Sequence, residues 1–240
     1  MSYPKRNYMP SEKRKLIHSL IFPALFIFII WMVKFSEIIF NIDFKDLGVY
    51  PRSVFGLIGI ITSPFIHANF AHLIANSLPL FFLSFMLFYF YREISYKIFF
   101  LIFFVTGIWV WFGGRESFHI GASGIVYGLA SFLFFSGIIR RNTKLMGITL
   151  VIAFLYGSMI WGIFPEFFPE KNISWESHLS GLLGGLIFAY YYRKQGPKIK
   201  KYDWEDDEDE DEDDDEDDEN QYWKLPSVDL PSKIKYHYKD

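Results

Sequence analysis

The chain of 240 residues contains no cysteine. Disulfide bonds, thiolate nucleophiles and metal sites built on cysteine are therefore excluded. Acidic residues are scarce outside one segment: sixteen of the 27 lie between positions 203 and 219, which leaves 11 against 24 lysines and arginines. The formal net charge of -3 therefore describes no part of the molecule, because most of the chain is basic and one run is strongly acidic.

Long apolar runs make up the middle of the chain, which is 51% hydrophobic and 21% aromatic overall. A helix needs roughly 20 apolar residues to cross a hydrocarbon core of about 30 Å. We therefore predict an all-α membrane protein with six spans, at residues 16–33, 70–91, 97–112, 121–139, 145–164 and 175–192. The long connection between the first two spans has apolar stretches too short to cross, and we expect it to lie partly in the membrane interface.

Basic residues mark one side of the predicted bundle. They cluster in the N-terminal arm (residues 1–15), at Arg92 and Lys97, at residues 140–144 and at residues 193–201. Because basic residues favour cytoplasmic connections, this pattern predicts that both termini are cytoplasmic. The second, fourth and sixth spans would then begin at the outer face.

These features divide the chain into a basic cytoplasmic arm (residues 1–15), a membrane domain (residues 16–193) and a cytoplasmic tail (residues 194–240). The acidic run 203–219 repels itself and is expected to be disordered. It is either a solvating extension or a segment that binds an unknown basic partner, and nucleic acid is not an expected partner.

The first span follows a basic arm but no small-residue cleavage site follows it, so we expect it to be retained. Because no organelle-targeting segment is evident, we expect a multi-pass protein of the bacterial plasma membrane.

Polar residues within membrane spans are costly and are functional candidates. The second span opens with His72 and Asn76, the fourth with Ser123 and the sixth with His178. Each lies within about two turns of the outer end of its span at 1.5 Å per residue. Any one of them could simply make a hydrogen bond between helices. Together they bring a hydroxyl, two imidazoles and an amide to one layer, which indicates a site.

Two sets of glycines accompany this layer at a spacing of three and four residues. They are Gly121, Gly124 and Gly128 in the fourth span, and Gly181 and Gly185 after His178 in the sixth. Small residues at this spacing let two membrane helices approach closely, and packing alone could explain them. Such an approach would also bring the His178 imidazole within hydrogen-bond reach of the Ser123 hydroxyl.

A serine beside a base is the general arrangement for nucleophilic acyl transfer. Tyr127, one turn below Ser123, is placed to pack against the His178 ring. No carboxylate lies inside a predicted span, and Glu176 points to the far side of its helix, so the pair is a dyad without an acid. We predict that activity falls at low pH as the His178 imidazole protonates, and a flat profile between about pH 5 and 8 would contradict this role.

Two further pairs of residues, one within a span and one in loops, complete the prediction of the site and its surroundings. His72 and Asn76, four residues apart on one helix face, offer an N–H and an amide to a developing oxyanion. His67 and His119 lie in predicted loops, and we expect them at the membrane interface.

Three motifs carry a resemblance to a known family: His-Leu-Ile-Ala-Asn at residues 72–76, Gly-Ala-Ser-Gly at residues 121–124 and His-Leu-Ser-Gly-Leu-Leu-Gly-Gly at residues 178–185. With Thr106-Gly107 and the stretch 110–115, they resemble the rhomboid family of intramembrane serine proteases across residues 48–192.

This resemblance implies a six-helix bundle with Ser123 as nucleophile and His178 as general base and then acid. It implies His72, Asn76 and the Ser123 backbone N–H as oxyanion donors, membrane-anchored proteins cut in or near their spans as substrates, and neither cofactor nor metal. The Trp-Arg pair that many members carry in the first external loop is missing, and Tyr50-Pro51-Arg52 occupies a comparable region.

Two other classes compete with the protease. A catalytically silent rhomboid-like protein would bind membrane helices, but such proteins have usually lost the serine or the histidine. A small transporter would place ionisable groups near the midplane and show inverted repeats, and the sequence displays neither.

Overall fold

The structure is a computed structural model that describes residues 11–155 and 174–196. Within these ranges the regular elements are helical, apart from one antiparallel backbone bridge between Val49 and His119. The α-helices are α1 Ser11–Phe40, α2 Gly59–Thr62, α3 Phe70–Phe90, α4 Ser95–Gly113, α5 Ser123–Ile139, α6 Thr143–Leu155 and α8 Trp175–Tyr191. Three short 3₁₀ turns, η1 Lys45–Leu47, η2 Phe55–Leu57 and η3 Ser63–Phe65, lie in the connection between α1 and α3. The predicted all-α class is confirmed, and each predicted span falls on one helix, the fifth as far as Leu155, where the described residues break off.

Three of these helices are long and apolar enough to cross a membrane. They cover residues Glu12–Phe40, Phe70–Phe90 and Ser95–Gly113. The central helix α5 is also apolar but has 17 residues. At 1.5 Å per residue this length is about 25 Å, close to the lower limit for a span.

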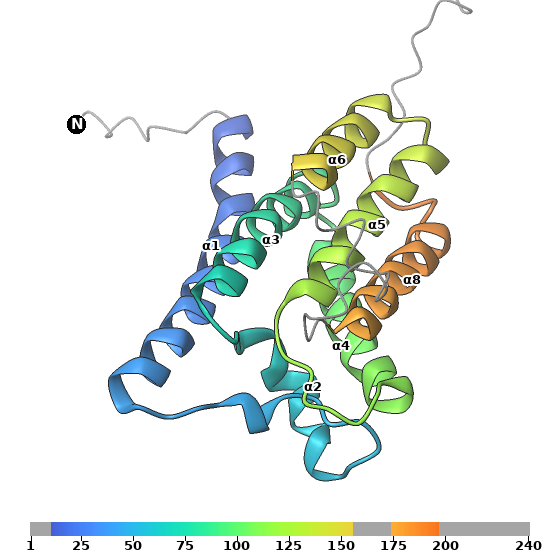
Figure 1. Cartoon of the computed structure of the whole chain (residues 1–240). Coiled ribbons are helices and arrows are strands. Elements are labelled where there is room, and N and C mark those ends of the chain that lie inside the picture. Colours follow the sequence, from blue (N-terminus) through green and yellow to red (C-terminus); the bar gives the residue numbers. More distant parts are fainter. Residues whose placement is uncertain (1–10, 156–173, 197–240) are drawn as a thin grey trace, which may run out of the picture. The chain divides into compact units, whose positions relative to one another are not determined.

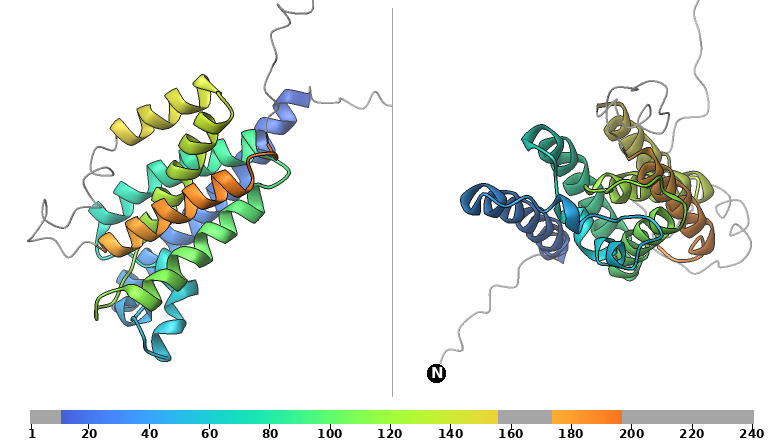
Figure 2. Two further views of the ribbon diagram at one scale, coloured as in Figure 1. Left: turned by 90° about the vertical axis from the view of Figure 1, so that its right-hand side faces the viewer. Right: turned by 60° about the horizontal axis from the view of Figure 1, so that its bottom comes forward.

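Helix α5 lies at the centre of the bundle, with α8 along one side and α3, α4 and α6 also against it (Figure 1). Helix α4 packs against α8 as well, and the two run side by side in Figure 2. The first residues of α3, α5 and α8 therefore meet at one end of the bundle, and their last residues at the other. This arrangement brings Ser123 and His178, which lie in the first turns of α5 and α8, close to each other.

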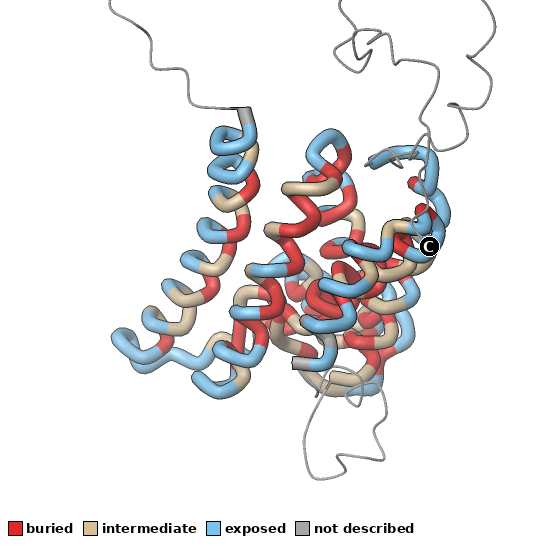
Figure 3. The backbone as a smooth tube through the Cα atoms, turned by 90° about the horizontal axis from the view of Figure 1, so that it is seen from above, coloured by how far each residue is buried: buried red, intermediate tan, exposed pale blue. Residues whose placement is uncertain are grey.

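Aromatic rings hold α1 to the rest of the bundle. Phe22 stacks on Phe88 of α3 with ring centroids 4.8 Å apart and meets the edge of Phe99 of α4, also at 4.8 Å. Further along, the Trp31 indole donates a hydrogen bond to the Ser77 hydroxyl (3.0 Å). The outer side of α1 is exposed in Figure 3, as expected for a helix that faces lipid on one side.

Helix α1 is longer than the sequence predicts. The expected connection from residue 34 begins instead after Phe40. The reason is a tertiary contact: the Lys34 ammonium pairs with Glu37 at 2.8 Å and donates to the backbone carbonyl of His67 at 2.9 Å. Paired in this way, two charged residues can continue a helix that an apolar pattern would end.

The basic cluster at residues 140–144 also differs from expectation, because Arg140 is buried rather than on the surface. Its guanidinium donates to the carbonyl of Tyr192 at 3.1 Å and to the Ser136 hydroxyl at 3.3 Å. Arg140 therefore ties the end of α5 to the end of α8. Residues 1–10 of the predicted arm 1–15, the end of the fifth span and the acidic run all lie outside the described residues.

Candidate active site

A contact between side chains of α5 and α8 joins Ser123 and His178. The His178 Nε2 atom lies 2.8 Å from the Ser123 hydroxyl oxygen. The Tyr127 ring stacks on the His178 imidazole, with centroids 4.2 Å apart and planes inclined by 13°. Ser123 is partly exposed and His178 is buried. A hydroxyl that substrate could reach is thus held against an imidazole whose ring plane is fixed.

The close approach of α5 and α8 depends on their glycines. A Cβ added to Gly181 would fall on the Gly124 carbonyl, and one added to Gly185 would fall on the Gly128 carbonyl. The two backbones therefore touch at successive turns, which small residues alone allow. Without this contact the imidazole could not reach the hydroxyl.

Gly121 does not join this packing, contrary to the spacing argument. Helix α5 begins at Ser123, and Gly121 precedes it with φ +105, a conformation that favours glycine. A Cβ there would lie 2.7 Å from the His72 ring. Gly121 thus gives the His72 imidazole access to the backbone beside Ser123.

The two candidate oxyanion donors of α3 face this same backbone. The Nε2 atom of His72 and the Nδ2 atom of Asn76 lie 2.8 and 3.8 Å from where a Cβ on Gly121 would be. Asn69 begins α3 by accepting a hydrogen bond from the His72 backbone N–H (2.9 Å), which fixes the register of the helix. The Asn76 amide donates one of its two hydrogens to the His72 carbonyl at 3.1 Å, a bond that orients the amide without using both hydrogens.

A third donor comes from the start of α5. Ser123 is the first residue of the helix, and the first N–H groups of a helix have no partner within it. The positive end of the helix dipole also points here. His72, Asn76 and the Ser123 backbone therefore place several donors around one small volume.

The loop that lacks the Trp-Arg pair is docked on the end of α4 by Arg52. The Arg52 guanidinium donates to the Gly114 carbonyl at 3.2 Å, and its backbone N–H donates to the Trp111 carbonyl at 2.9 Å. The Trp111 indole donates a hydrogen bond to the Ser53 carbonyl at 2.8 Å. Arg52 and Trp111 thus hold this loop against the end of α4.

His67 and His119 lie in loops, as expected, but both side chains are buried within the protein rather than exposed at its surface. The His67 ring lies 5.0 Å from that of His72, and among the described residues neither of its ring nitrogens has a hydrogen-bond partner. Burial lowers the pKa of His67 to about 3, and the nearby His72 and Lys34 charges act in the same direction. Burial also lowers the pKa of His119. Both imidazoles are therefore neutral at physiological pH.

Glu176 takes part in a polar cluster that the sequence did not reveal. One carboxylate oxygen lies 3.5 Å from the Arg115 guanidinium, and the other lies 3.9 Å from Nδ1 of His119. These contacts turn Glu176 toward the loop before α5. In the sequence, Arg115 and His119 precede α5 and Glu176 lies far from them at the start of α8. Nothing else in the sequence indicates that these polar residues meet.

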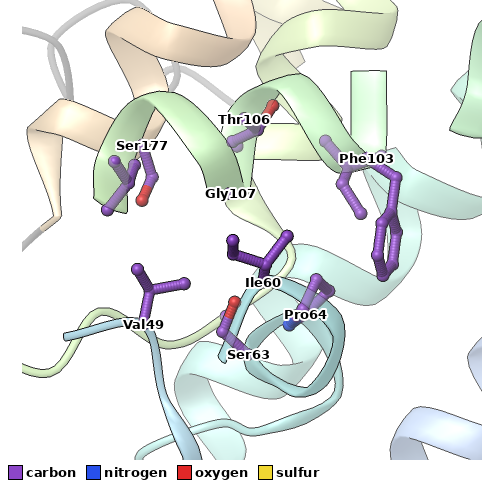
Figure 4. A pocket seen from close by; sticks show the side chains of 12 residues that line it. Val49, Ile60, Ser63, Pro64, Phe103, Thr106, Gly107 and Ser177 are labelled. Atoms are coloured by element: carbon purple, nitrogen blue, oxygen red, sulfur yellow. The ribbon is translucent and has the colours of Figure 1, made fainter. Parts of the chain in front are cut away.

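A small cavity is lined by residues of α2, η3, α4 and the first turns of α5 and α8 (Figure 4). It holds about 20 Å³, enough for one water molecule and too little for a substrate side chain. Ser63, Thr106 and Ser177 are among the residues that line it, as are Gly121 and Gly124, which flank Ser123 in the sequence. Neither Ser123 nor His178 lines it, so it is not the site of reaction.

Comparison with known proteins gives a consistent family assignment. The family model described as Rhomboid domain matches residues 55–195. An uncharacterized protein of Mycobacterium tuberculosis is 30% identical over 171 residues, which cover 69% of this chain and 71% of the relative. An uncharacterized protein of Mycobacterium leprae is 28% identical over 172 residues, 69% of this chain and 68% of its own. A protein of Acanthamoeba polyphaga mimivirus whose name assigns it to the rhomboids is 27% identical over 149 residues, 57% of this chain and 75% of its own.

Proposed function

Because the chain belongs to the rhomboid family, whose members are integral membrane proteins that act on membrane-protein substrates, we propose that it is an intramembrane serine endopeptidase. The observation that carries this proposal is the 2.8 Å contact between His178 Nε2 and the Ser123 hydroxyl. In a lipid-facing bundle, a serine hydroxyl held against a histidine and flanked by hydrogen-bond donors is suited to acyl transfer.

In the first half of the reaction, His178 acts as a base. Its Nε2 atom takes the Ser123 proton while the hydroxyl oxygen attacks the substrate carbonyl carbon. Negative charge develops on the carbonyl oxygen, where His72, Asn76 and the Ser123 backbone N–H donate hydrogen bonds. The protonated imidazole then gives its proton to the leaving amine as the peptide bond breaks.

The second half consumes one water molecule. His178, neutral again, takes a proton from the water as its oxygen attacks the acyl carbon. The second tetrahedral intermediate collapses, the ester bond to Ser123 breaks, and the imidazole returns the proton to the serine. The stack against Tyr127 would hold the imidazole in one orientation through both halves.

The proposed orientation places the dyad at the outer face of a bacterial plasma membrane and both termini in the cytoplasm. Most basic residues of the described chain lie at the bundle end opposite the dyad, which favours the cytoplasm for that end. They are Lys13, Arg14, Lys15, Arg92, Lys97, Arg141, Lys144, Arg193 and Lys194. The mycobacterial relatives support a bacterial source. We propose the same division of the chain into an arm (residues 1–15), a membrane domain (residues 16–193) and a tail (residues 194–240). We also propose that the acidic run of the tail is available to bind a basic partner.

The test is cleavage of a single-span reporter protein by the purified full chain in detergent. Wild type is compared with Ser123→Ala and His178→Ala, and with His18→Ala, which removes an exposed histidine of α1 as a matched control. Loss of either dyad residue should lower the cleavage rate at least about 10³-fold, whereas His18→Ala should not. A fluorophosphonate probe should label Ser123 in the wild type and in His18→Ala.

The alternative, a catalytically silent protein that binds membrane helices, makes the opposite prediction. The wild type would then neither cut the reporter nor react with the fluorophosphonate, while the folded protein would still bind the reporter span. That combination of results would overturn the proposed protease.

A further inference from the structure

Ser174 stands at the N-cap position of α8, where a serine ordinarily accepts a hydrogen bond from the helix backbone. Its side chain makes no such cap. The hydroxyl instead lies 2.6 Å from Nδ1 of His119 and 2.6 Å from the Ser177 hydroxyl. Ser174 therefore occupies the N-cap position but uses its hydroxyl to contact His119, in another part of the chain.

The direction of these bonds follows from the His119 ring. Its Nε2 atom lies 3.1 Å from the Arg115 carbonyl, which can only accept, so Nε2 carries the hydrogen. In the neutral ring Nδ1 is then an acceptor, and Ser174 donates to it. Ser177 in turn donates to Ser174. The chain of bonds therefore runs from Ser177 through Ser174 to His119, and Ser174 makes the link that joins the two parts of the molecule.

His119 is a firm anchor for this link. Its backbone exchanges two hydrogen bonds with Val49, at 2.8 and 2.9 Å, and its ring is held by the Arg115 carbonyl. It also lies four residues before Ser123 in the chain. A residue bound to His119 is therefore held relative to the start of α5.

Ser174 transmits this position to His178. The His178 backbone N–H lies 3.4 Å from the Ser174 carbonyl, one helical turn away. Gly181 and Gly185 hold the later turns of α8 against α5. The first turn, which carries His178, is held through Ser174 and, beside it, by Glu176 and Arg115.

We infer that Ser174 and His119 are positioning residues, which fix the first turn of α8 so that the His178 imidazole meets the Ser123 hydroxyl. This inference rests on the proposed function, because the geometry it protects is that of the proposed dyad. Neither residue touches the reacting atoms.

The chain offers a matched pair of variants, Ser174→Ala and Ser177→Ala, in the same turn of the same helix. Ser174→Ala breaks the link to His119, whereas Ser177→Ala leaves it intact. In the full chain we expect Ser174→Ala to lower kcat for reporter cleavage about 10-fold or more with KM nearly unchanged, since small displacements of reacting groups cost up to about 100-fold. Ser177→Ala should change kcat less than about threefold. Ser174→Thr, which keeps the hydroxyl, should restore the rate.

A second measurement does not depend on activity. Hydrogen–deuterium exchange of the backbone at residues 177–182 should be faster in Ser174→Ala than in wild type or Ser177→Ala, with the thermal unfolding midpoint close to that of wild type. Equal exchange in the two variants would overturn the inference, as would equal kcat or a rate loss that Ser174→Thr fails to restore. A wild type that neither cuts nor labels would overturn the proposed function, while the exchange comparison would still decide whether Ser174 holds the turn.

Discussion

The backbone carbonyl of Gly124 lies where a side chain on Gly181 would begin, so the helices that carry Ser123 and His178 touch backbone to backbone. We therefore expect Gly181→Ala to force α8 away from α5. Overpacking of this kind costs about 1–3 kcal/mol of unfolding free energy, and a displacement of about 1 Å can cost roughly 100-fold in rate. Thermal unfolding in detergent and reporter cleavage would measure the two effects.

Gly184→Ala is the matched control, three residues further along the same helix. Its added methyl group would meet Val105 Cγ1 of α4 at 3.2 Å, a side chain that can move slightly. Replacing a helical glycine by alanine gains about 0.5–1 kcal/mol, so this variant should be nearly as stable and active as wild type. Equal behaviour of the two variants would show that the Gly124 contact does not hold the dyad.

The proposed oxyanion role of His72 and Asn76 predicts a specific kinetic pattern. Each donor serves the transition state more than the bound substrate, so His72→Ala and Asn76→Ala should each lower kcat about 10²–10³-fold with little change in KM. Asn69→Ala, one turn earlier, is the control because it removes a helix cap, worth about 1 kcal/mol, and no oxyanion donor. A raised KM at constant kcat would instead assign His72 and Asn76 to substrate binding.

The parts of the site that the sequence predicts are those carried by helical periodicity. His72 with Asn76, and His178 with Gly181 and Gly185, repeat at three or four residues, so their shared faces can be read without coordinates. The depth of each along its span then brings the three helices to one layer. Periodicity of this kind is local, which explains why these predictions needed no knowledge of the fold.

The parts that the sequence did not predict depend on contacts between distant segments. Val49 pairs with His119, 70 residues later, and this pairing buries a histidine that its loop position would leave exposed. Gly121 has the right spacing for helix packing, but its positive φ turns it toward His72 instead. From the sequence, Arg140 belongs to a basic surface turn, but in the structure the end of α8 covers it. In each case a tertiary neighbour decides the outcome.

The buried histidines predict that stability falls as the solution becomes acidic. The pKa of His67 is lowered to about 3 and that of His119 is also lowered, chiefly by burial, whereas in the unfolded chain a histidine protonates near pH 6.5. Below about pH 6.5 the unfolded chain therefore binds more protons than the folded one, so stability is complete above this pH and is lost as the pH falls toward 3. The thermal unfolding midpoint in detergent should drop between pH 7.5 and pH 5.

His67→Gln provides the comparison, because its neutral amide does not titrate in this range. The fall in unfolding midpoint between pH 7.5 and pH 5 should become smaller in this variant without vanishing, since His119 still contributes. An identical fall in variant and wild type would mean that burial of His67 does not govern the acid sensitivity.

At the other end of the bundle, Arg140 predicts a loss of stability without a loss of chemistry. Its guanidinium bonds to the Ser136 hydroxyl and the Tyr192 carbonyl, and hydrogen bonds to charged groups are worth about 1.5–3 kcal/mol. Arg140→Ala should lower the unfolding midpoint, and Arg140→Lys should recover only part of it because an ammonium cannot span both acceptors. Lys144→Ala, which removes an exposed charge nearby, should change stability by less than about 0.5 kcal/mol. Since the dyad lies at the opposite end, Ser123 in folded Arg140→Ala should react with a fluorophosphonate at the wild-type rate, and slow labelling would show that the two ends of α5 and α8 are coupled.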